Sequence, residues 1–348
     1  GTSGARKVEW ASLATARLAT ARLATAGVAM QGYFAAFVFR LTCRPADLQA
    51  GFSIYTERPM RTIAVISKPQ KPDLAPILNE LVLWIRARGM EPILDPVSGS
   101  YVQGARIVAR HDMAAEHPEL AIVLGGDGTL LAAARVFAKS KVPILSVNLG
   151  SLGFLTEVRL SELFTNLEGW SCGSCHIEAR AMLHVDIIRD GQLFRCYDAL
   201  NDIVVSKGAI ARMGDFRVLL GEQLAMAFRA DGVIVSTPTG STAYFLSAGG
   251  PIIHPNVDAL GIAGLLPHTL FARPLLVPTS AEIAITCDSE LSLANLENDG
   301  FVAAELVAGD RVLIRRAEKP VRFARVRPRA FFARLEDKLQ WGVPIKSR

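Results

Sequence analysis

The feature that most constrains the fold of this chain is the segment AIVLGGDGTLLAAARVF, residues 121–137. Its first four residues are apolar and typical of a buried strand, whereas residues 130–137 have the apolar spacing of a helix. A tight turn between the two is allowed by Gly125, Gly126 and Gly128. Thr129 is placed to cap the helix, so the segment predicts a strand, a turn and a helix in direct succession.

The predicted turn has the composition of a site that binds phosphate groups. Its glycines let the backbone approach a ligand, and the N–H groups at the start of a helix favour an anion. Asp127 would repel that anion, but in a kinase a carboxylate at this position can orient a substrate hydroxyl and accept its proton. Taken alone, the GGDG sequence is equally compatible with a capped turn that carries a solvated aspartate.

The residues around this unit indicate an open, mostly parallel sheet. Residues 61–67 and 91–94 are typical of short strands, and residues 74–88 between them repeat apolar side chains at helical spacing. A further strand, 143–147, leads into the segment NLGSLGFLTE, residues 148–157. Since such sheets bind ligands at the carboxyl ends of their strands, the glycine turn and this segment are candidates for two ligand loops that face each other. The second segment is equally compatible with an ordinary connection between domains.

The periodicity of apolar residues changes beyond about residue 161, from 3.6 to mostly two. Short segments rich in Val and Ile alternate there with turns rich in Gly, Asp and Pro. These segments are residues 181–189, 200–208, 215–221, 232–238, 281–287 and 310–316. The pattern predicts an α/β domain at 60–160 and a mainly β domain at 161–320. The tail, 321–348, contains an amphipathic helix at about 331–339 and is expected to pack back on the first domain.

Residues 1–59 differ from the rest of the chain. They contain the repeat ATARLATARLATAG, residues 14–27, and carry seven Lys or Arg against three acidic residues. An Arg-rich, acid-poor segment is compatible with a transit peptide. We favour the alternative that it is sequence upstream of a start at Met60. In either case we expect this extension to lie outside the active fold.

Charge and cysteine content exclude several classes of function. The formal net charge is +5, but residues 1–59 contribute +4 of it, so the body of the chain gives no reason to expect a nucleic-acid partner. Five scattered cysteines, an odd number, fit a reducing compartment better than a disulfide framework. No apolar run approaches the roughly 20 residues of a membrane span. We therefore expect a cytoplasmic protein without a nucleic-acid or membrane partner.

The segment CGSCH, residues 172–176, has the sequence of a covalent haem attachment site. Its two cysteines and His176 are also zinc ligands by type, but no second pair is spaced to complete a zinc site. Nothing else in the sequence marks an axial haem ligand. We therefore interpret the segment as a loop and expect no metal there.

A second polar segment, residues 230–255, places a strand directly before a dense run of Ser, Thr and Gly. Small hydroxylated residues are poor core formers, but they suit the close approach of backbone and hydroxyl groups to a polar ligand. Asn201 and Asp202 stand before another apolar strand, where a simple turn is the alternative. The chain contains neither a Walker loop nor a GxGxxG motif, which disfavours a hydride-transfer enzyme on a standard dinucleotide fold.

Taken together, these motifs resemble those of bacterial-type NAD kinases, from about residue 60 onward. The resemblance rests on six segments in a fixed order, because GGDGT alone is similar to sequences in 6-phosphofructokinases and diacylglycerol-type lipid kinases. The segments are GGDGT at 125–129, NLGSLGFLTE at 148–157, LND at 200–202, DGVIVSTPTGSTAY at 231–244, GGPIIHP at 249–255 and LPHTLFARPL at 266–275.

The resemblance implies an α/β N-terminal domain with an open, mostly parallel sheet, a mainly β C-terminal domain, and an active site between them. It also implies phosphorylation of NAD on the 2′-hydroxyl of its adenosine ribose, with ATP or polyphosphate as donor and Mg²⁺ on the donor phosphates. Family members are usually homodimers or homotetramers. The alternatives are a lipid or sugar kinase of the GGDGT type and a non-catalytic NAD-binding regulator.

Site residues follow from the same resemblance, position by position. Asp127 matches the general base, and Asn201 and Asp202 match the pair that holds the adenosine half of NAD. The family usually has Glu at the position of Asp202, and a polar residue at the position of Phe301. The other residues that the resemblance assigns to the nucleotide site are Gly125, Gly126, Gly128, Thr129, Phe154, Arg212, Arg229, Asp231, Thr242, Ala243, Tyr244 and Ser247. No protein residue is expected to hold the metal.

Overall fold

The structure is a computed structural model that describes residues 61–150, 153–208, 213–269, 272–287, 294–325 and 331–342. The expected extension at 1–59 and the predicted site residue Arg212 lie outside the described residues.

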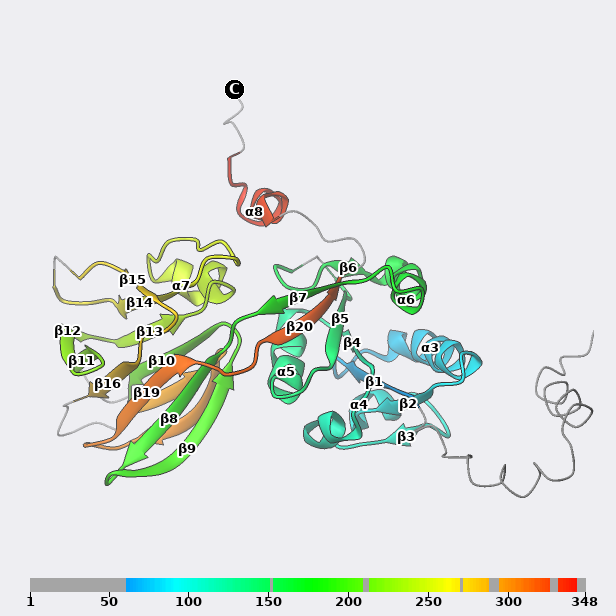
Figure 1. Cartoon of the computed structure of the whole chain (residues 1–348), viewed down its shortest axis with the longest axis horizontal. Helices are drawn as coiled ribbons and strands as arrows, with labels where there is room; N and C mark the ends of the chain where they lie inside the picture. The colour runs from blue at the N-terminus through cyan, green and yellow to red at the C-terminus, as the bar shows by residue number, and fades with distance from the viewer. Residues whose placement is uncertain are drawn as a thin grey trace, which may run out of the picture. The chain divides into compact units, whose positions relative to one another are not determined.

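An eight-stranded sheet forms the centre of the first domain (Figure 1). Its strands follow the order β3-β2-β1-β4-β5-β20-β7, and β6 pairs with the end of β5. All neighbours are parallel except β20 and β7, which are antiparallel. The strands are β1 (Thr62–Ser67), β2 (Glu91–Leu94), β3 (Arg106–Ile107), β4 (Leu120–Leu124), β5 (Pro143–Asn148), β6 (Val158–Arg159), β7 (His176–Arg180) and β20 (Val321–Arg325).

Both faces of this sheet are covered, which explains why its central strands are apolar at every position. Ile63 and Val65 of β1 pack with helix α3 (Ala75–Ala87), whereas Ala64 and Ile66 pack with helix α5 (Asp127–Phe137). The remaining helical segments of this domain are η2 (Pro72–Leu74), α4 (Pro96–Gly99), η3 (Arg110–Glu116), η4 (Leu160–Glu162) and α6 (Leu163–Ser171).

Sheet membership corrects the predicted domain boundaries. Strand β7, at residues 176–180, belongs to the first sheet, so the border lies near residue 181 rather than at 160. The tail returns to this sheet as β20, whose Val321, Phe323 and Ala324 are buried in its two apolar clusters. A strand that joins a sheet across such a sequence distance leaves no local signal, which is why the apolar periodicity did not predict the border.

The second domain is a sandwich of two six-stranded antiparallel sheets, and the mainly β prediction is confirmed. One sheet has the order β15-β14-β13-β10-β17-β18, and the other β12-β11-β16-β19-β8-β9. The strands are β8 (Leu183–Arg189), β9 (Gln192–Ala199), β10 (Asp202–Lys207), β11 (Gly214–Leu220), β12 (Gln223–Ala230), β13 (Gly232–Ser236), β14 (Ala259–Leu265), β15 (Leu275–Pro278), β16 (Ile283–Cys287), β17 (Ala294–Asn298), β18 (Phe301–Leu306) and β19 (Arg311–Arg316).

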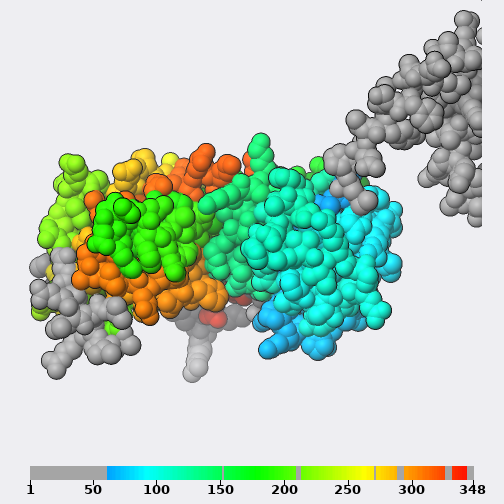
Figure 2. All heavy atoms as spheres, turned by 90° about the horizontal axis from the view of Figure 1, so that it is seen from below, coloured from blue at the N-terminus to red at the C-terminus, as the bar shows by residue number. Residues whose placement is uncertain are grey.

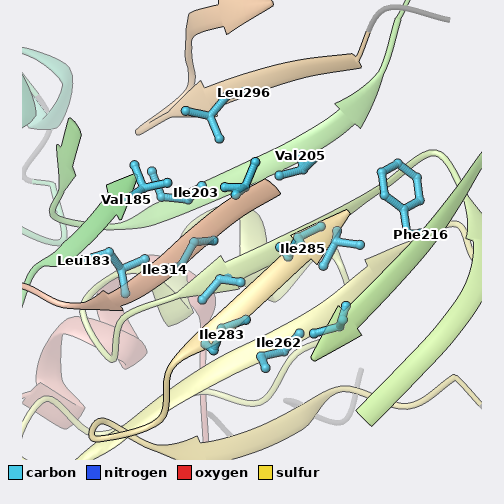
Figure 3. Close-up of a cluster of buried hydrophobic side chains, with 14 of the residues drawn as sticks. Leu183, Val185, Ile203, Val205, Phe216, Ile262, Ile283, Ile285, Leu296 and Ile314 are labelled. Atoms are coloured by element: carbon cyan, nitrogen blue, oxygen red, sulfur yellow. The ribbon is translucent and has the colours of Figure 1, made fainter. Parts of the chain in front are cut away.

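The core of the sandwich consists of residues that alternate along these strands. Val185, Ile203 and Phe216 meet residues from β16, β17 and β19 in one apolar cluster (Figure 3). A smaller cluster around Phe245 covers the other face of the sheet that contains β13. The short segments η5 (Gly240–Thr242) and α7 (Tyr244–Ser247) lie there, and α8 (Phe331–Leu339) follows β20. None of the described helices is long and apolar enough to cross a membrane.

Candidate active site

The carboxylate of Asp127 is held by the segment that follows strand β5. It accepts hydrogen bonds from the backbone N–H groups of Phe154 (3.0 Å), Leu155 (3.3 Å) and Thr156 (3.1 Å). The Thr156 hydroxyl donates a fourth bond at 2.9 Å. These bonds confirm that the two loops at the ends of β4 and β5 face each other, and they fix the orientation of the Asp127 side chain.

The start of helix α5 differs from the prediction. The helix begins at Asp127, with Gly126 as its N-cap and no side-chain cap. The prediction that Thr129 caps the helix is therefore wrong, because Asp127 and Gly128 already belong to the helix. Thr129 lies in the first turn, where its N–H donates to the Gly126 carbonyl at 3.1 Å.

Glycine is required at two positions of these loops, one where the loops touch and one inside the first turn. A Cβ atom on Gly153 would lie 2.0 Å from Oδ1 of Asp127, and one on Gly125 would lie 2.5 Å from the Thr129 hydroxyl. In contrast, a Cβ on Gly126 or Gly128 would meet no heavy atom within 4 Å. The turn is therefore closed on the side of residue 153 and open beside Gly126 and Gly128, at the end of α5 where an anion binds most favourably.

Side chains of strand β5 and of the loop itself hold the backbone of the loop that contacts Asp127. The Thr156 hydroxyl accepts a bond from Nδ2 of Asn148 at 2.6 Å, and the Gly150 N–H donates to the side-chain oxygen Oδ1 of Asn148 at 2.6 Å. Ser146 donates to the Leu155 carbonyl at 3.2 Å. The segment 148–157, predicted as a candidate ligand loop or as a connection between domains, thus supplies both the donors to Asp127 and the groups that position them.

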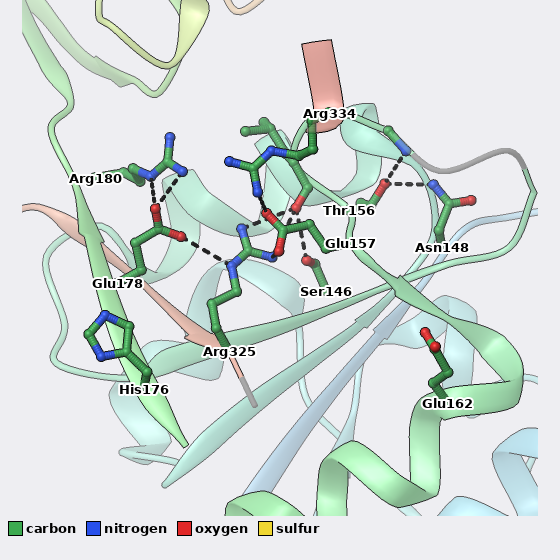
Figure 4. A network of polar contacts seen from close by, with 12 residues as sticks. Ser146, Asn148, Thr156, Glu157, Glu162, His176, Glu178, Arg180, Arg325 and Arg334 are labelled. Carbon is green, nitrogen blue, oxygen red and sulfur yellow. Dashed lines mark hydrogen bonds and ion pairs between the residues drawn. The ribbon is translucent and has the colours of Figure 1, made fainter. Parts of the chain in front are cut away.

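Behind this loop lies a chain of alternating charges (Figure 4). Arg325 of strand β20 donates to the Leu155 carbonyl at 3.3 Å and pairs with Glu157 (3.4 Å) and Glu178 (3.3 Å). Arg334 of α8 also pairs with Glu157, and Arg180 of β7 pairs with Glu178 at 2.5 Å. Sequence reasoning missed this network, because its members come from strands and a helix far apart in the chain.

The charges of this network stabilise one another. Burial opposes ionisation of Glu178, but Arg180 and Arg325 outweigh burial and lower the pKa of that carboxyl. Arg180 also reaches the second domain, where it donates to the Thr239 hydroxyl at 3.4 Å. The network therefore connects the Asp127 loop to the Ser- and Thr-rich segment.

Asn201 and Asp202 lie where strand β10 begins, and Asp299 holds their backbone. The Asp299 carboxylate accepts from the N–H groups of Leu200 (3.2 Å), Asn201 (2.7 Å) and Asp202 (3.4 Å). It also accepts from Arg135 of helix α5 at 3.1 Å. Since Asp127 begins the same helix, α5 connects the predicted base to the predicted Asn-Asp pair.

Asp202 is a buried carboxyl, 4% exposed. Burial, with the nearby Asp299 and Glu297, raises its pKa to about 7. The pKa of Asp299 is also raised by burial, although the backbone N–H groups of 200–202 and Arg135 oppose that shift. Asp202 can therefore act as a hydrogen-bond donor as well as an acceptor near neutral pH.

Part of the Ser- and Thr-rich segment holds the backbone rather than facing open space. Thr237 donates its N–H to the Asn201 carbonyl at 2.9 Å and its hydroxyl to the Leu200 carbonyl at 2.6 Å. Ser241 links the same segment to Ile253. A Cβ on Gly240 would lie 2.2 Å from the Asn201 carbonyl oxygen, so glycine permits this contact.

The following residues of the segment are more open. Thr242 and Ala243 are half-buried, whereas Tyr244 and Ser247 are exposed. Burial raises the pKa of the Tyr244 phenol, with further contributions from Glu297, Asp202 and Asp231. Tyr244 therefore lies in one polar region with Asp202 and Asp231, the two predicted site residues that carry carboxyl groups here.

Three other predicted residues have partners of their own. Phe154 is half-buried in the loop that holds Asp127. Asp231 pairs with Lys207 at 3.0 Å. Arg229 is exposed on β12 and pairs with Asp215 on β11 at 2.7 Å. Phe301 is also exposed, with the Arg135 guanidinium 5.6 Å from its ring centre. The sequence did not predict that Asp299, paired with Arg135, holds the backbone of residues 200–202. The Asp-Gly pair at 299–300, which is typical of a turn, was the one sequence feature that pointed to Asp299.

Comparison with domain families identifies both halves of the fold. Residues 63–174 match the ATP-NAD kinase N-terminal domain, and residues 200–326 match the ATP-NAD kinase C-terminal domain. Together with these matches, the fold and the site define a class of two-domain kinases. Its members have an α/β domain followed by a β-sandwich, and the fixed carboxylate lies at a glycine-rich helix start.

Relatives narrow this class. The chain is 55% identical over 283 residues to the NAD kinase of Acidobacterium capsulatum, covering 81% of this chain and 99% of that one. It is 48% identical, with the same coverage, to the NAD kinase of Koribacter versatilis. The chain belongs to the NAD kinase family, so it is an enzyme of the kinase type, and the predicted family is confirmed.

Solved structures share the fold. The yeast NADH kinase complexed with NADH matches with a TM-score of 0.76 at 23% identity, covering 83% of this chain and 90% of that one. The NAD kinase from Archaeoglobus fulgidus in complex with ATP matches with a TM-score of 0.61 at 21% identity, covering 80% and 98%. The predicted two-domain fold is therefore confirmed.

Proposed function

We propose that this chain transfers the terminal phosphoryl group of ATP or polyphosphate to the 2′-hydroxyl of the adenosine ribose of NAD, giving NADP. The observation that carries the proposal is the fixed carboxylate of Asp127 at the open start of helix α5, in a chain of the NAD kinase family.

Among the described residues, Oδ2 of Asp127 accepts fewer hydrogen bonds than Oδ1 and has capacity for a substrate. Oδ1 accepts three hydrogen bonds, from two N–H groups and the Thr156 hydroxyl, whereas Oδ2 accepts one, from Phe154. Because a carboxylate oxygen has two lone pairs, Oδ2 can accept one further hydroxyl. As that hydroxyl attacks the phosphorus, its proton passes to Oδ2.

The phosphate groups of the donor fit the other side of the turn. The start of α5 has free space beside the Cα atoms of Gly126 and Gly128, and the helix dipole favours negative charge at this end. The donors that surround Asp127 make it a poor metal ligand, so we expect Mg²⁺ on the donor phosphates rather than on the protein. A Mg²⁺ ion bound there would neutralise charge on the group that is transferred.

The adenosine half of NAD fits the region of Asn201 and Asp202. Oδ1 of Asn201 is buried and has no hydrogen-bond partner among the described residues, so it is available to an N–H group of a ligand. The carboxyl groups of Asp202 and Asp231 and the hydroxyl of Tyr244 are further hydrogen-bonding groups for the ribose and for the nicotinamide amide of NAD. The roles of Phe154, Arg212, Arg229, Thr242, Ala243 and Ser247 stay predictions.

The test is NADP formation from NAD, measured side by side with Mg-ATP and with Mg-polyphosphate. We expect turnover with at least one donor. A chain that binds NAD but forms no NADP at any concentration of either donor would instead be a non-catalytic NAD-binding regulator. Light scattering after size exclusion tests the further proposal of a homodimer or homotetramer.

A further inference from the structure

Four polar side chains form a block on one face of the β8–β9 hairpin, outside the site described above. His184 pairs in register with Asp198, and Asp186 pairs with Cys196. Alternate residues of a strand share a face, so these four side chains project together while Leu183 and Val185 enter the core. The hairpin, in green, lies at the surface in the space-filling view (Figure 2). Cys196 itself is exposed.

The His184 ring lies between two carboxylates. Nδ1 lies 2.6 Å from Oδ1 of Asp198, and Nε2 lies 3.1 Å from Oδ1 of Asp186. A ring proton on Nδ1 would donate to Asp198 and leave Nε2 as an acceptor. Nε2 of the neutral ring then presents a lone pair to a carboxylate oxygen, and two acceptors repel each other unless a second proton or a metal ion satisfies both.

The neighbouring thiol favours the metal ion. A ring nitrogen of His184, a carboxylate oxygen of Asp186 and Sγ of Cys196 all lie within 4.8 Å of one another. In a tetrahedral zinc site with bonds of about 2.0–2.3 Å, ligand atoms are roughly 3.3–3.6 Å apart, so the His184 and Asp186 atoms are already close to that spacing. A nitrogen, an oxygen and a sulfur ligand suit Zn²⁺ and not Mg²⁺.

The residues around these three ligands have the arrangement of a metal site's outer shell. Asp198 holds Nδ1 of His184 and directs Nε2 toward the ion, as a carboxylate does behind many zinc-bound histidines. Arg315 holds Oδ2 of Asp186 at 2.6 Å, which leaves Oδ1 for the metal. Lys139 lies 3.4 Å from Oδ2 of Asp198. His184 and Asp198 also line a cavity of about 470 Å³, through which a fourth ligand can enter.

We propose that His184, Asp186 and Cys196 form a Zn²⁺ site on the β8–β9 hairpin, separate from the nucleotide site and independent of the proposed reaction. The CGSCH segment is the competing location for a metal. Its residues form no such three-ligand group in the part of the chain that the structure describes.

The test uses the full chain, freed of metal by a chelator and titrated with Co²⁺ and then Zn²⁺. We expect one Co²⁺ per chain, with a thiolate-to-cobalt charge-transfer band and the visible bands of a tetrahedral ion, and displacement of both by Zn²⁺. Cys196→Ser should abolish the charge-transfer band. Asp198→Asn should weaken binding about 10- to 100-fold, because it removes the group that directs His184.

The matched control is the double variant Cys172→Ser/Cys175→Ser, which removes the thiols of the CGSCH segment. It should keep the band and the affinity of the unmodified chain. Absence of stoichiometric binding would overturn the proposal, as would a band that survives Cys196→Ser or disappears in the control. Because Cys196 is exposed and lies outside the core, the serine variant should fold, which circular dichroism checks.

Discussion

Replacing Asp127 by Asn separates a catalytic carboxylate from a structural one. The amide keeps the size of the side chain and one acceptor oxygen, which can retain the bonds from Leu155 and Thr156. Its NH₂ group takes the place of Oδ2 and cannot accept the N–H of Phe154. One charge-assisted hydrogen bond is lost, so we expect the free energy of unfolding to fall by about 2 kcal/mol.

The effect on turnover should be larger. Loss of a general base lowers a rate by about 10²–10⁴, or roughly 3–5 kcal/mol of transition-state stabilisation. NAD binding should change little, because the amide adds no bulk. The assay measures Tm, NAD affinity by calorimetry and kcat on one preparation of Asp127→Asn.

The control for this experiment is Thr156→Val, which removes one donor to Oδ1 and leaves the carboxylate and its open Oδ2 in place. We expect it to lose stability comparable to the Asn variant but to keep kcat within about tenfold. Near-normal turnover of Asp127→Asn would refute the catalytic assignment. Equal loss of kcat in both variants would show that the carboxylate acts only by holding the loop.

Three further changes test the surroundings of this site. Gly153→Ala should lower kcat by at least tenfold, because the new Cβ would lie 2.0 Å from Oδ1 of Asp127 and displace that side chain. A lower kcat with unchanged NAD affinity in steady-state kinetics would show this displacement of Asp127, and an unchanged kcat would contradict it. Arg325→Leu should lower the free energy of unfolding by about 3–5 kcal/mol in urea, since it leaves Glu157 buried with one partner fewer. Asp202, with its pKa raised from 3.8 to about 7, should make the folded chain less stable as pH rises from 4 to 7, by up to about 4 kcal/mol. Asp202→Asn should remove that decline from urea unfolding curves, and an unchanged slope would show that the raised pKa is not the cause.

The sequence predicted those parts of the site whose chemistry is local. Gly125, Asp127 and the apolar runs beside them define a strand, a turn and a helix within a few residues. The second loop was also expected to face the first, because parallel strands end at the same edge of a sheet. Within this unit, the predicted start of helix α5 was wrong, because the helix begins at Asp127, two residues before Thr129.

The contacts that position the site were not predictable in the same way. Arg135 and Asp299 are 164 residues apart, and Arg325 and Leu155 are 170 residues apart. Each residue, taken alone, is an ordinary charged or apolar side chain with no spacing that points to its partner. Such pairs are set by which strands become neighbours, and apolar periodicity indicates strands without their order.

Strand β20 has a consequence for biosynthesis. It occupies the place between β5 and β7, so β7 has no neighbour in the first sheet until the last strand of that sheet has been made. A chain emerging from the ribosome must complete the whole β-sandwich while the β5 edge beside Pro143 and Ile144 stays open. Open strand edges recruit other chains, so the nascent first domain is most prone to aggregation during this interval and becomes closed only when Val321, Phe323 and Ala324 are buried.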